Sequence, residues 1–138
     1  MMLKKFYKIL IVPYTLFLLY LMFLGMGRFQ YDDNVVRIEP ILSTIRFIEG
    51  TISWKDIIII VLGNIVMFIP FGFLGWVFPQ LKDLKNLLFT FMSAIIIAEA
   101  LQYFTRMGIF EVDDIILNTF GVYLGWLMCK QLENKLAI

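Results

Sequence analysis

The sequence predicts an all-α integral membrane protein, a helical bundle of about four transmembrane helices. Its 138 residues are 61% hydrophobic, with a mean hydropathy of +0.85. An ordinary soluble domain has an apolar share of about 45–50%. The apolar residues gather in four runs, and the first two are as long as the ~20 residues that a helix needs to cross a bilayer. We find no linker or internal repeat, so residues 1–138 are expected to form one domain.

The four predicted spans cover about residues 6–27, 57–78, 87–104 and 115–129. The first span is longer than the ~7–15 apolar residues of a signal peptide, and no small-residue cleavage site follows it, which indicates an uncleaved helix. The third and fourth spans are shorter and contain polar residues. Such residues are typical of membrane helices that face the interior of a bundle.

The loop at residues 28–56 carries a weaker helical pattern. Pro40 is placed to begin a short helix. Apolar residues then fall on one side and polar residues on the other: Ile41, Leu42, Ile45 and Ile48 against Ser43, Arg46 and Glu49. This pattern predicts an interfacial helix in the first external loop. A partly buried loop with accidental periodicity remains the alternative.

The distribution of basic residues predicts the orientation in the cell membrane. One side of the bundle would hold Lys4, Lys5, Lys8, Lys82, Lys85, Lys130 and Lys135. The other side would hold Arg28, Arg37, Arg46, Lys55 and Arg106. Because cytoplasmic loops carry the excess of Lys and Arg, both termini of this multi-pass protein are expected in the cytoplasm.

The residue content excludes several classes of site. The chain has no histidine and one cysteine, Cys129, so a disulfide within the chain, a Cys/His zinc site and a histidine-based catalytic triad are excluded. No basic helix or arm is present, so no nucleic acid is expected as a partner. We expect neither a metal ion nor a cofactor. Chemistry in this protein would use carboxylates, amides, arginine and the backbone.

Three polar residues are predicted to meet in the outer half of the bilayer. Asn64 lies about two turns inside the outer end of its span, Glu99 lies about six residues from the outer end of the third, and Asn118 lies about one turn into the fourth. A charged side chain within a membrane costs at least ~2.5 kcal/mol on the lenient insertion scale, and such residues are functional by default. Glu99 is therefore the strongest candidate for a functional residue.

Helical spacing extends this group into two stripes. Glu99, Gln102 and Arg106 are related as i, i+3 and i+7, so they share one helix face. The second stripe lies on the last span and has a polar and a small-residue end: Asp114, Asn118, Gly121 and Gly125. Two glycines four residues apart let another backbone approach closely. Both faces are thus expected to contact protein and not lipid.

Structural alternatives remain open for these polar residues. Asn64 and Asn118 could hold helices together by hydrogen bonds. Glu99 could form an ion pair with an arginine, either Arg28 or Arg106. One of the two carboxylates Asp113 and Asp114 is expected to cap the start of the last helix.

The stretch "NIVMFIPFGFLGWVFP", residues 64–79, has a proline in its centre. Pro70 cannot donate a hydrogen bond to the carbonyl of Val66, and its ring crowds that turn. We therefore expect the second span to kink or unwind at this point. Membrane helices tolerate such a break where protein or water satisfies the freed backbone groups.

Three blocks of sequence resemble the VanZ-like membrane proteins: "GNIVMFIPFGFLGW", "EALQYF" and "FEVDDIILNTFGVYLGW". They occur in the family's order and cover roughly residues 57–129. The matching positions are Asn64, Pro70, Phe71 and Gly72, then Glu99 and Gln102, then Asp114, Asn118 and Gly121. One departure is Glu111, which stands where the family usually has aspartate.

The resemblance implies a link to antibiotics, because the family's namesake is associated with low-level resistance to teicoplanin-type glycopeptides. The leading hypothesis is a module that limits access of the antibiotic to cell-wall precursors through an outer-leaflet pocket. The predicted pocket residues are Asn64, Glu99, Gln102, Arg106, Asp114 and Asn118, with Pro70, Gly72, Gly121 and Gly125 in structural roles. Expected partners are membrane lipids and a lipoglycopeptide or lipid-linked cell-wall precursor. A homo-oligomer is compatible with so small a bundle.

Two other functions remain open from the sequence. One is a membrane enzyme that acts on a lipid-linked or lipid substrate, with Glu99 or Asp114 as the acid/base and Asn64 or Asn118 orienting the substrate. The other is a small proton-coupled transporter in which Glu99 exchanges a proton for a cationic solute.

Overall fold

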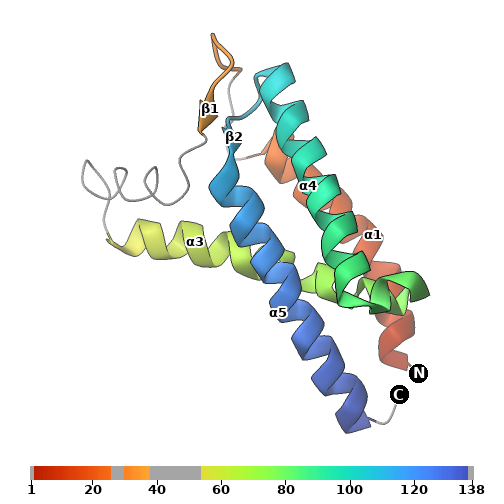
Figure 1. Ribbon diagram of the computed structural model, residues 1–138. Coiled ribbons are helices and arrows are strands. Elements are labelled where there is room, and N and C mark those ends of the chain that lie inside the picture. Colours follow the sequence, from red (N-terminus) through yellow and green to blue (C-terminus); the bar gives the residue numbers. More distant parts are fainter. Residues whose placement is uncertain (1, 26–29, 38–53, 137–138) are drawn as a thin grey trace.

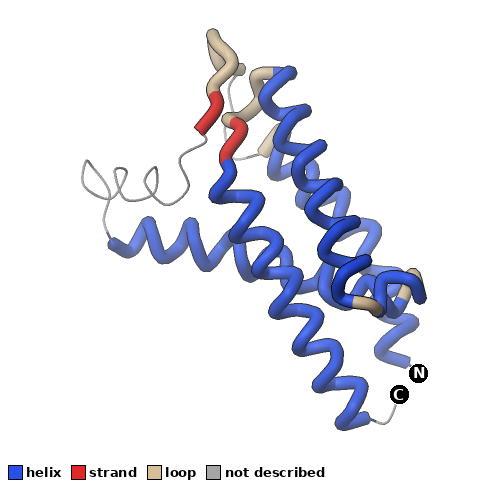
Figure 2. The backbone as a smooth tube through the Cα atoms, viewed as in Figure 1, coloured by secondary structure: helices blue, strands red, loops and turns tan. Residues whose placement is uncertain are grey.

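The computed structural model describes residues 2–25, 30–37 and 54–136, and Figure 2 shows that most of them are helical. The described residues form four α-helices: α1 (Met2–Phe23), α3 (Trp54–Phe68), α4 (Leu84–Thr105) and α5 (Val112–Leu136). Two 3₁₀ helices join α3 to α4: η1 (Ile69–Trp76) and η2 (Pro79–Lys82). Two short strands, β1 (Val36–Arg37) and β2 (Phe110–Glu111), complete the described chain. The predicted all-α class is confirmed.

Helices α1, α4 and α5 are long and apolar enough to cross a membrane. Large apolar side chains such as Phe17, Phe89 and Phe104 are exposed on them. So many exposed large apolar side chains on helices of this length suit a lipid environment. The start of α1 and the end of α5 lie at the same end of the bundle (Figure 1).

Helices α4 and α5 are longer than the apolar runs that predicted the third and fourth spans. Helix α4 begins three residues earlier than expected because the side chain of Asp83 accepts a hydrogen bond of 3.2 Å from the backbone N–H of Asn86. Helix α5 continues past Cys129 to Leu136 through polar residues. Hydropathy marks the part of a helix that suits lipid, whereas hydrogen bonding sets where the helix ends.

Residues 57–78, expected to form the second span, are not one continuous α-helix. The α-helix ends at Phe68, and η1 continues from Ile69 with the tighter 3₁₀ pattern. The predicted break at Pro70 is confirmed, because this proline has no N–H to donate to the carbonyl of Val66. Figure 1 shows that α3 lies across the direction of α4 and α5 and not alongside them.

Two tyrosines of α1 hold the region of this break. The hydroxyl of Tyr14 donates a hydrogen bond of 2.7 Å to the carbonyl of Met67, and the hydroxyl of Tyr7 donates one of 2.9 Å to the carbonyl of Pro70. Carbonyl groups next to a helix break lose regular helical partners and need others within a membrane. Helix α1 therefore supplies the polar partners that the break requires.

Glycines bring the backbone of α5 into contact with α3 and η1. A Cβ atom added to Gly121 would meet the carbonyl oxygen of Ile65, and one added to Gly125 would meet the carbonyl oxygen of Ile69. A Cβ atom added to Gly72 would meet the backbone of Gly125. The approach of the two segments therefore depends on the absence of side chains at these positions.

The core lies where α4 and α5 pack on α3 and η1. Leu87 and Val122 have no exposed surface. Phe68, Phe71 and Phe91 form a cluster of aromatic rings whose centroids are 5.6–5.8 Å apart. These contacts fix the relative positions of the helices, and with them the polar residues on α3, α4 and α5.

The two strands form a parallel pair at the end of the bundle opposite the termini. Val36 is paired with Phe110, and Arg37 is paired with Glu111. The sequence pattern did not predict this pair. The interfacial helix expected from Pro40 onward lies outside the described residues.

Candidate functional site

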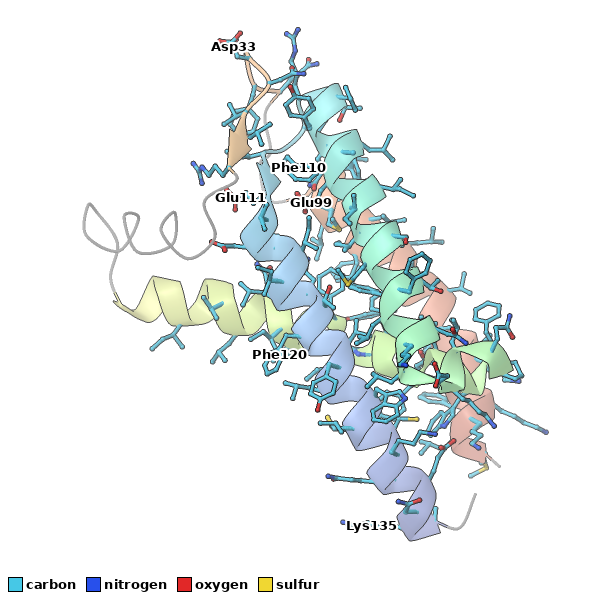
Figure 3. All side chains as sticks on the ribbon, viewed as in Figure 1. Asp33, Glu99, Phe110, Glu111, Phe120 and Lys135 are labelled. Atoms are coloured by element: carbon cyan, nitrogen blue, oxygen red, sulfur yellow. The ribbon has the colours of Figure 1, made fainter. Side chains whose placement is uncertain are left out.

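The polar residues predicted to converge lie around the first turns of α5. Figure 3 shows Glu99, Phe110 and Glu111 at one end of the bundle, whereas Lys135 lies at the other. Helix α4 provides Glu99 and Gln102, helix α5 provides Asp114 and Asn118, and α3 provides Asn64. We call these five residues the polar cluster.

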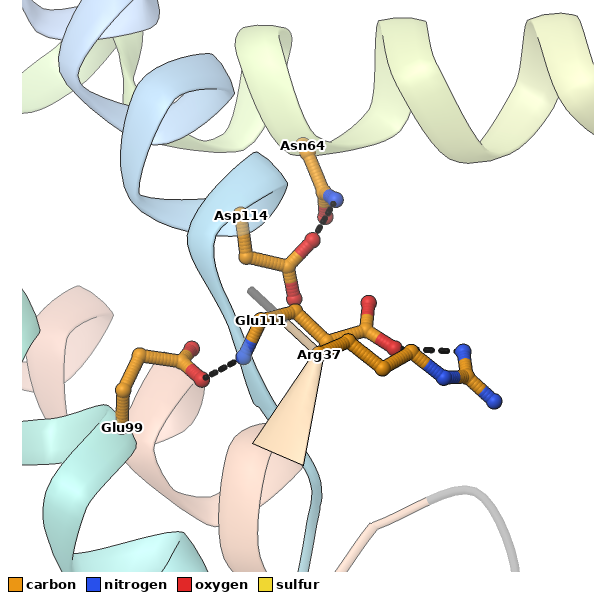
Figure 4. Close-up of polar contacts among 5 residues, drawn as sticks. All are labelled: Arg37, Asn64, Glu99, Glu111 and Asp114. Carbon is orange, nitrogen blue, oxygen red and sulfur yellow. Dashed lines mark hydrogen bonds and ion pairs between the residues drawn. The ribbon is translucent and has the colours of Figure 1, made fainter. Parts of the chain in front are cut away.

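Glu99 is held against the chain segment that leads into α5. Its side chain is only 2% exposed. The backbone N–H of Glu111 donates a hydrogen bond of 3.3 Å to Glu99 Oε2 (Figure 4). A buried carboxylate is tolerated when donors of this kind surround it. The position of Glu99 is therefore linked to that of β2.

Asn64 and Asp114 are in direct contact. Asn64 Nδ2 donates a hydrogen bond of 3.0 Å to Asp114 Oδ1, and both side chains are half-buried (Figure 4). The sequence left open which of Asp113 and Asp114 faces the cluster, and Asp114 is the one that contacts Asn64. This bond joins α3 to the first turn of α5.

Asn118 is the least satisfied member of the polar cluster. Its side chain is 3% exposed, and its Oδ1 has no hydrogen-bond partner within the described residues. The hydroxyl of the neighbouring Thr119, which the sequence analysis did not single out, is also buried without a partner in this part of the chain. A buried polar atom without a partner costs about 1–3 kcal/mol, so a ligand or water that can donate a hydrogen bond is favoured here.

Gln102 acts mainly between helices. Its Nε2 donates a hydrogen bond of 2.8 Å to the carbonyl of Met22, and its side chain is 4% exposed. Met22 lies in the last turn of α1, where carbonyl groups have no partner within their own helix. Gln102 thus caps α1 and joins it to α4.

Arg106 does not join the polar cluster. It adopts a left-handed conformation with φ 58° at the end of α4, and its side chain turns to the segment before β1. Its Nε donates a hydrogen bond of 3.1 Å to Asn34 Oδ1, and its Nη1 donates one of 3.0 Å to the carbonyl of Asp32. The backbone N–H of Tyr31 bonds back to the carbonyl of Arg106 at 2.9 Å. Arg106 therefore anchors residues 30–37.

Glu111 connects Glu99 to Arg37, and the sequence did not predict this role. Its backbone N–H contacts Glu99, and its side chain forms an ion pair with Arg37 in which Nη1 and Oε1 are 2.6 Å apart. The pairing of β1 with β2 places these two side chains next to each other. The unusual glutamate at this position was the signal that could have drawn attention to it.

The ion pair between Arg37 and Glu111 is expected to add little stability, because both side chains are partly exposed. Replacing Arg37 by glutamine should lower the free energy of unfolding by less than ~1 kcal/mol. Thermal unfolding of the purified protein in detergent measures this change. A loss above ~2 kcal/mol would show that this ion pair contributes more to stability than a solvent-exposed ion pair does.

The chemistry available to the polar cluster is that of hydrogen-bond acceptors. It combines the carboxylates of Glu99 and Asp114 with Asn118 Oδ1, which has no hydrogen-bond partner in the part of the chain that the structure describes. No group of three or more His, Cys, Asp or Glu side chains that could hold a metal is found among the described residues. Such acceptors suit a ligand that presents amine or amide N–H groups.

Comparisons with known proteins agree with the resemblance in the sequence. The chain is 29% identical over 108 residues to the protein named VanZ from Enterococcus faecium, an alignment that covers 78% of this chain and 59% of that protein. This chain thus corresponds to less than two thirds of the length of that relative. No solved structure matches it. The family described as VanZ/LLP1 matches residues 11–133, and the chain therefore belongs to the VanZ/LLP1 family.

Proposed function

We propose that this membrane protein lowers susceptibility to teicoplanin-type glycopeptides by limiting their access to lipid-linked cell-wall precursors. Family membership and the namesake's association with resistance support this function. The observation that carries it is the polar cluster itself. Asn118 Oδ1 is buried without a partner in the described chain. Asn118 lies on α5, which also carries Asp114, and the strand β2 that leads into α5 holds Glu99 through the backbone N–H of Glu111.

We further propose that both termini are cytoplasmic, which places the polar cluster in the outer half of the bilayer. Lysines of α1, η2, α4 and α5 gather at the end where α1 starts and α5 finishes. The positive-inside rule assigns this end to the cytoplasm. Glycopeptides act outside the membrane, so this orientation brings the cluster to the side where the antibiotic works.

The recognition chemistry follows from the acceptors in the cluster. A glycopeptide offers amide and amine N–H groups, and an acylated one can also anchor its chain in the bilayer. An N–H group placed at Asn118 Oδ1 would supply the hydrogen bond that this buried oxygen does not receive from any described residue. The carboxylate of Glu99 or Asp114 would favour a cationic amine.

The test is surface labelling by fluorescent teicoplanin of Gram-positive cells that express the wild-type chain, the Asn118→Leu variant, or neither. We expect labelling to fall with the wild type and to return to the level of non-expressing cells with Asn118→Leu. Leucine keeps the branched skeleton of the side chain, although it is larger, and it removes the Oδ1 that has no partner in the described chain, so the variant should remain folded.

Measuring both labelling and thermal unfolding of Asn118→Leu separates a ligand-binding role of Asn118 from a structural one. If Asn118 holds helices together, Asn118→Leu should lower the thermal unfolding temperature, and the loss of function would follow from misfolding. The matched control is Thr119→Val, which also removes a buried oxygen without a partner in the described chain. Equal labelling of all cells would refute the proposed link to glycopeptides.

A membrane enzyme is the second candidate, and the buried carboxylate of Glu99 favours it. A backbone N–H fixes the position of one oxygen of this carboxylate, and a general base must be held in a defined position. This function predicts chemically altered lipid-linked precursors in expressing cells. Mass spectrometry of extracted lipids would detect them, and unaltered lipids alongside reduced labelling would favour the binding function.

A further inference from the structure

An apolar groove lies at the end of the bundle opposite the polar cluster. It has a volume of about 430 Å³ and runs between α1 and η1. Its lining includes Phe6, Tyr7 and Tyr14 of α1, and Pro70, Phe73 and Trp76 of η1. The volume falls within the ~300–1,000 Å³ of ligand pockets.

The walls of this groove present only carbon, although three of its residues carry polar atoms. The hydroxyls of Tyr7 and Tyr14 donate hydrogen bonds to the carbonyls of Pro70 and Met67, respectively. The indole Nε1 of Trp76 donates a hydrogen bond of 2.9 Å to Glu133. Because these donors are already engaged, the part of a ligand that enters the groove must be hydrocarbon.

The length of the groove matches one leaflet. On α1 it extends from Leu3 to Tyr14. At 1.5 Å per helical residue this is about 16 Å, which is close to half of the ~30 Å hydrocarbon core. Leu3, Phe6 and Leu10 on its rim are exposed, so the groove opens to the surrounding lipid. Its dimensions therefore fit an acyl chain that stands along the bilayer normal.

The charge beside the groove is positive. Lys4 Nζ lies 5.6 Å from the centroid of the Trp76 ring, and it contacts Glu133 at 3.4 Å. Glu133 is also 3.7 Å from Lys130, so one carboxylate faces two ammonium groups. Lys5 and Lys8 are exposed on the same end of α1. An anionic head group would be attracted here.

We propose that this groove is a binding site for an anionic phospholipid, with one acyl chain along η1 and α1 and the phosphate near Lys4. This site is separate from the polar cluster and does not depend on the function proposed above. It would hold a lipid of the leaflet at the terminal end. The bound chain would cover Pro70 and the 3₁₀ segment, where the helix is broken.

The test uses quenching of Trp76 fluorescence by brominated lipids in liposomes of phosphatidylcholine. The variant Trp54→Phe/Trp126→Phe leaves Trp76 as the single tryptophan of the 138 residues. We expect brominated phosphatidylglycerol to reach half-maximal quenching at about five-fold lower mole fraction than brominated phosphatidylcholine, the factor expected for one lysine near an anionic group. Lys4→Gln should abolish this preference, whereas Lys135→Gln should leave it in place.

A matched pair of substitutions on α1 tests the groove itself. Leu10→Phe places a larger side chain in the lining, whereas Ile9→Phe enlarges an exposed residue that does not line the groove. We expect Leu10→Phe to reduce quenching and Ile9→Phe to leave it unchanged. The proposal is overturned if both lipids quench equally or if the two variants behave alike.

The proposal can also be tested on the chain with all three tryptophans in place, in case the double substitution prevents folding. Native mass spectrometry of the full chain would count retained phosphatidylglycerol and phosphatidylcholine molecules. One retained phosphatidylglycerol that is lost in Leu10→Phe and kept in Ile9→Phe is expected. Retention that is the same for both lipids in all three proteins would show ordinary lipid contact and overturn the site.

Discussion

Replacing Gly125 by alanine is expected to be strongly destabilising. The added Cβ would meet the carbonyl oxygen of Ile69, which belongs to the backbone and cannot move aside as a flexible side chain can. Overpacking costs up to ~3 kcal/mol, and here α5 must separate from η1 to relieve it. For a chain of this size the thermal unfolding midpoint in detergent should fall by about 10 °C.

Gly63→Ala is the matched control for this prediction. Gly63 lies in α3, and nothing is within 4 Å of the position that its Cβ would occupy. Alanine is more favourable than glycine in a helix by ~0.5–1 kcal/mol, so this variant should be as stable as the wild type or more so. Equal unfolding temperatures for Gly125→Ala and Gly63→Ala would contradict the close backbone contact at Gly125.

The glycine contact illustrates what the sequence could predict. Two glycines four residues apart on an otherwise bulky helix indicated a close backbone approach, and the structure places Gly121 and Gly125 on the carbonyls of α3 and η1. The break at Pro70 could be predicted for a similar reason, because a missing N–H acts locally. Asn64 and Asp114, two of the predicted pocket residues, are in direct contact. Local covalent chemistry and helical geometry were sufficient for these features.

Arg106 shows where helical spacing failed as a guide. The spacing i, i+7 from Glu99 predicted a common face, but that holds only while the helix continues. Helix α4 ends at Thr105, and Arg106 takes a left-handed conformation that turns its side chain toward Asn34. Arg106 lies one residue past the end of the helix, so its side chain leaves the face that Glu99 and Gln102 share.

The role of Glu111 could not be predicted because it depends on contacts between distant segments. The strand β1 lies 74 residues before the paired position on β2, and no periodic pattern in so short a segment marks the pair. The tyrosines of α1 were missed for another reason. In an apolar span a tyrosine can pack or donate a hydrogen bond, and only the position of the break at Pro70 decides which.

Under the function proposed above, replacing Glu99 by glutamine is expected to abolish protection against teicoplanin while leaving the protein folded. Glutamine keeps the shape of the side chain and an oxygen that can accept the hydrogen bond from the N–H of Glu111. It removes the negative charge that a cationic ligand group or a proton transfer would use. Surface labelling by fluorescent teicoplanin should therefore rise to the level of cells without the protein.

Glu99→Leu separates the charge from the hydrogen bond. Leucine removes both, and the partly buried N–H of Glu111 then loses Glu99 as its acceptor, which costs about 1 kcal/mol. We expect Glu99→Leu to unfold at a lower temperature than Glu99→Gln, although both lack protection. If Glu99→Gln retains full protection, the charge of Glu99 has no part in the function and the residue serves to hold β2 against α4. If Glu99→Gln unfolds as readily as Glu99→Leu, its effect on labelling reports folding, and Asn118→Leu becomes the decisive variant for the polar cluster.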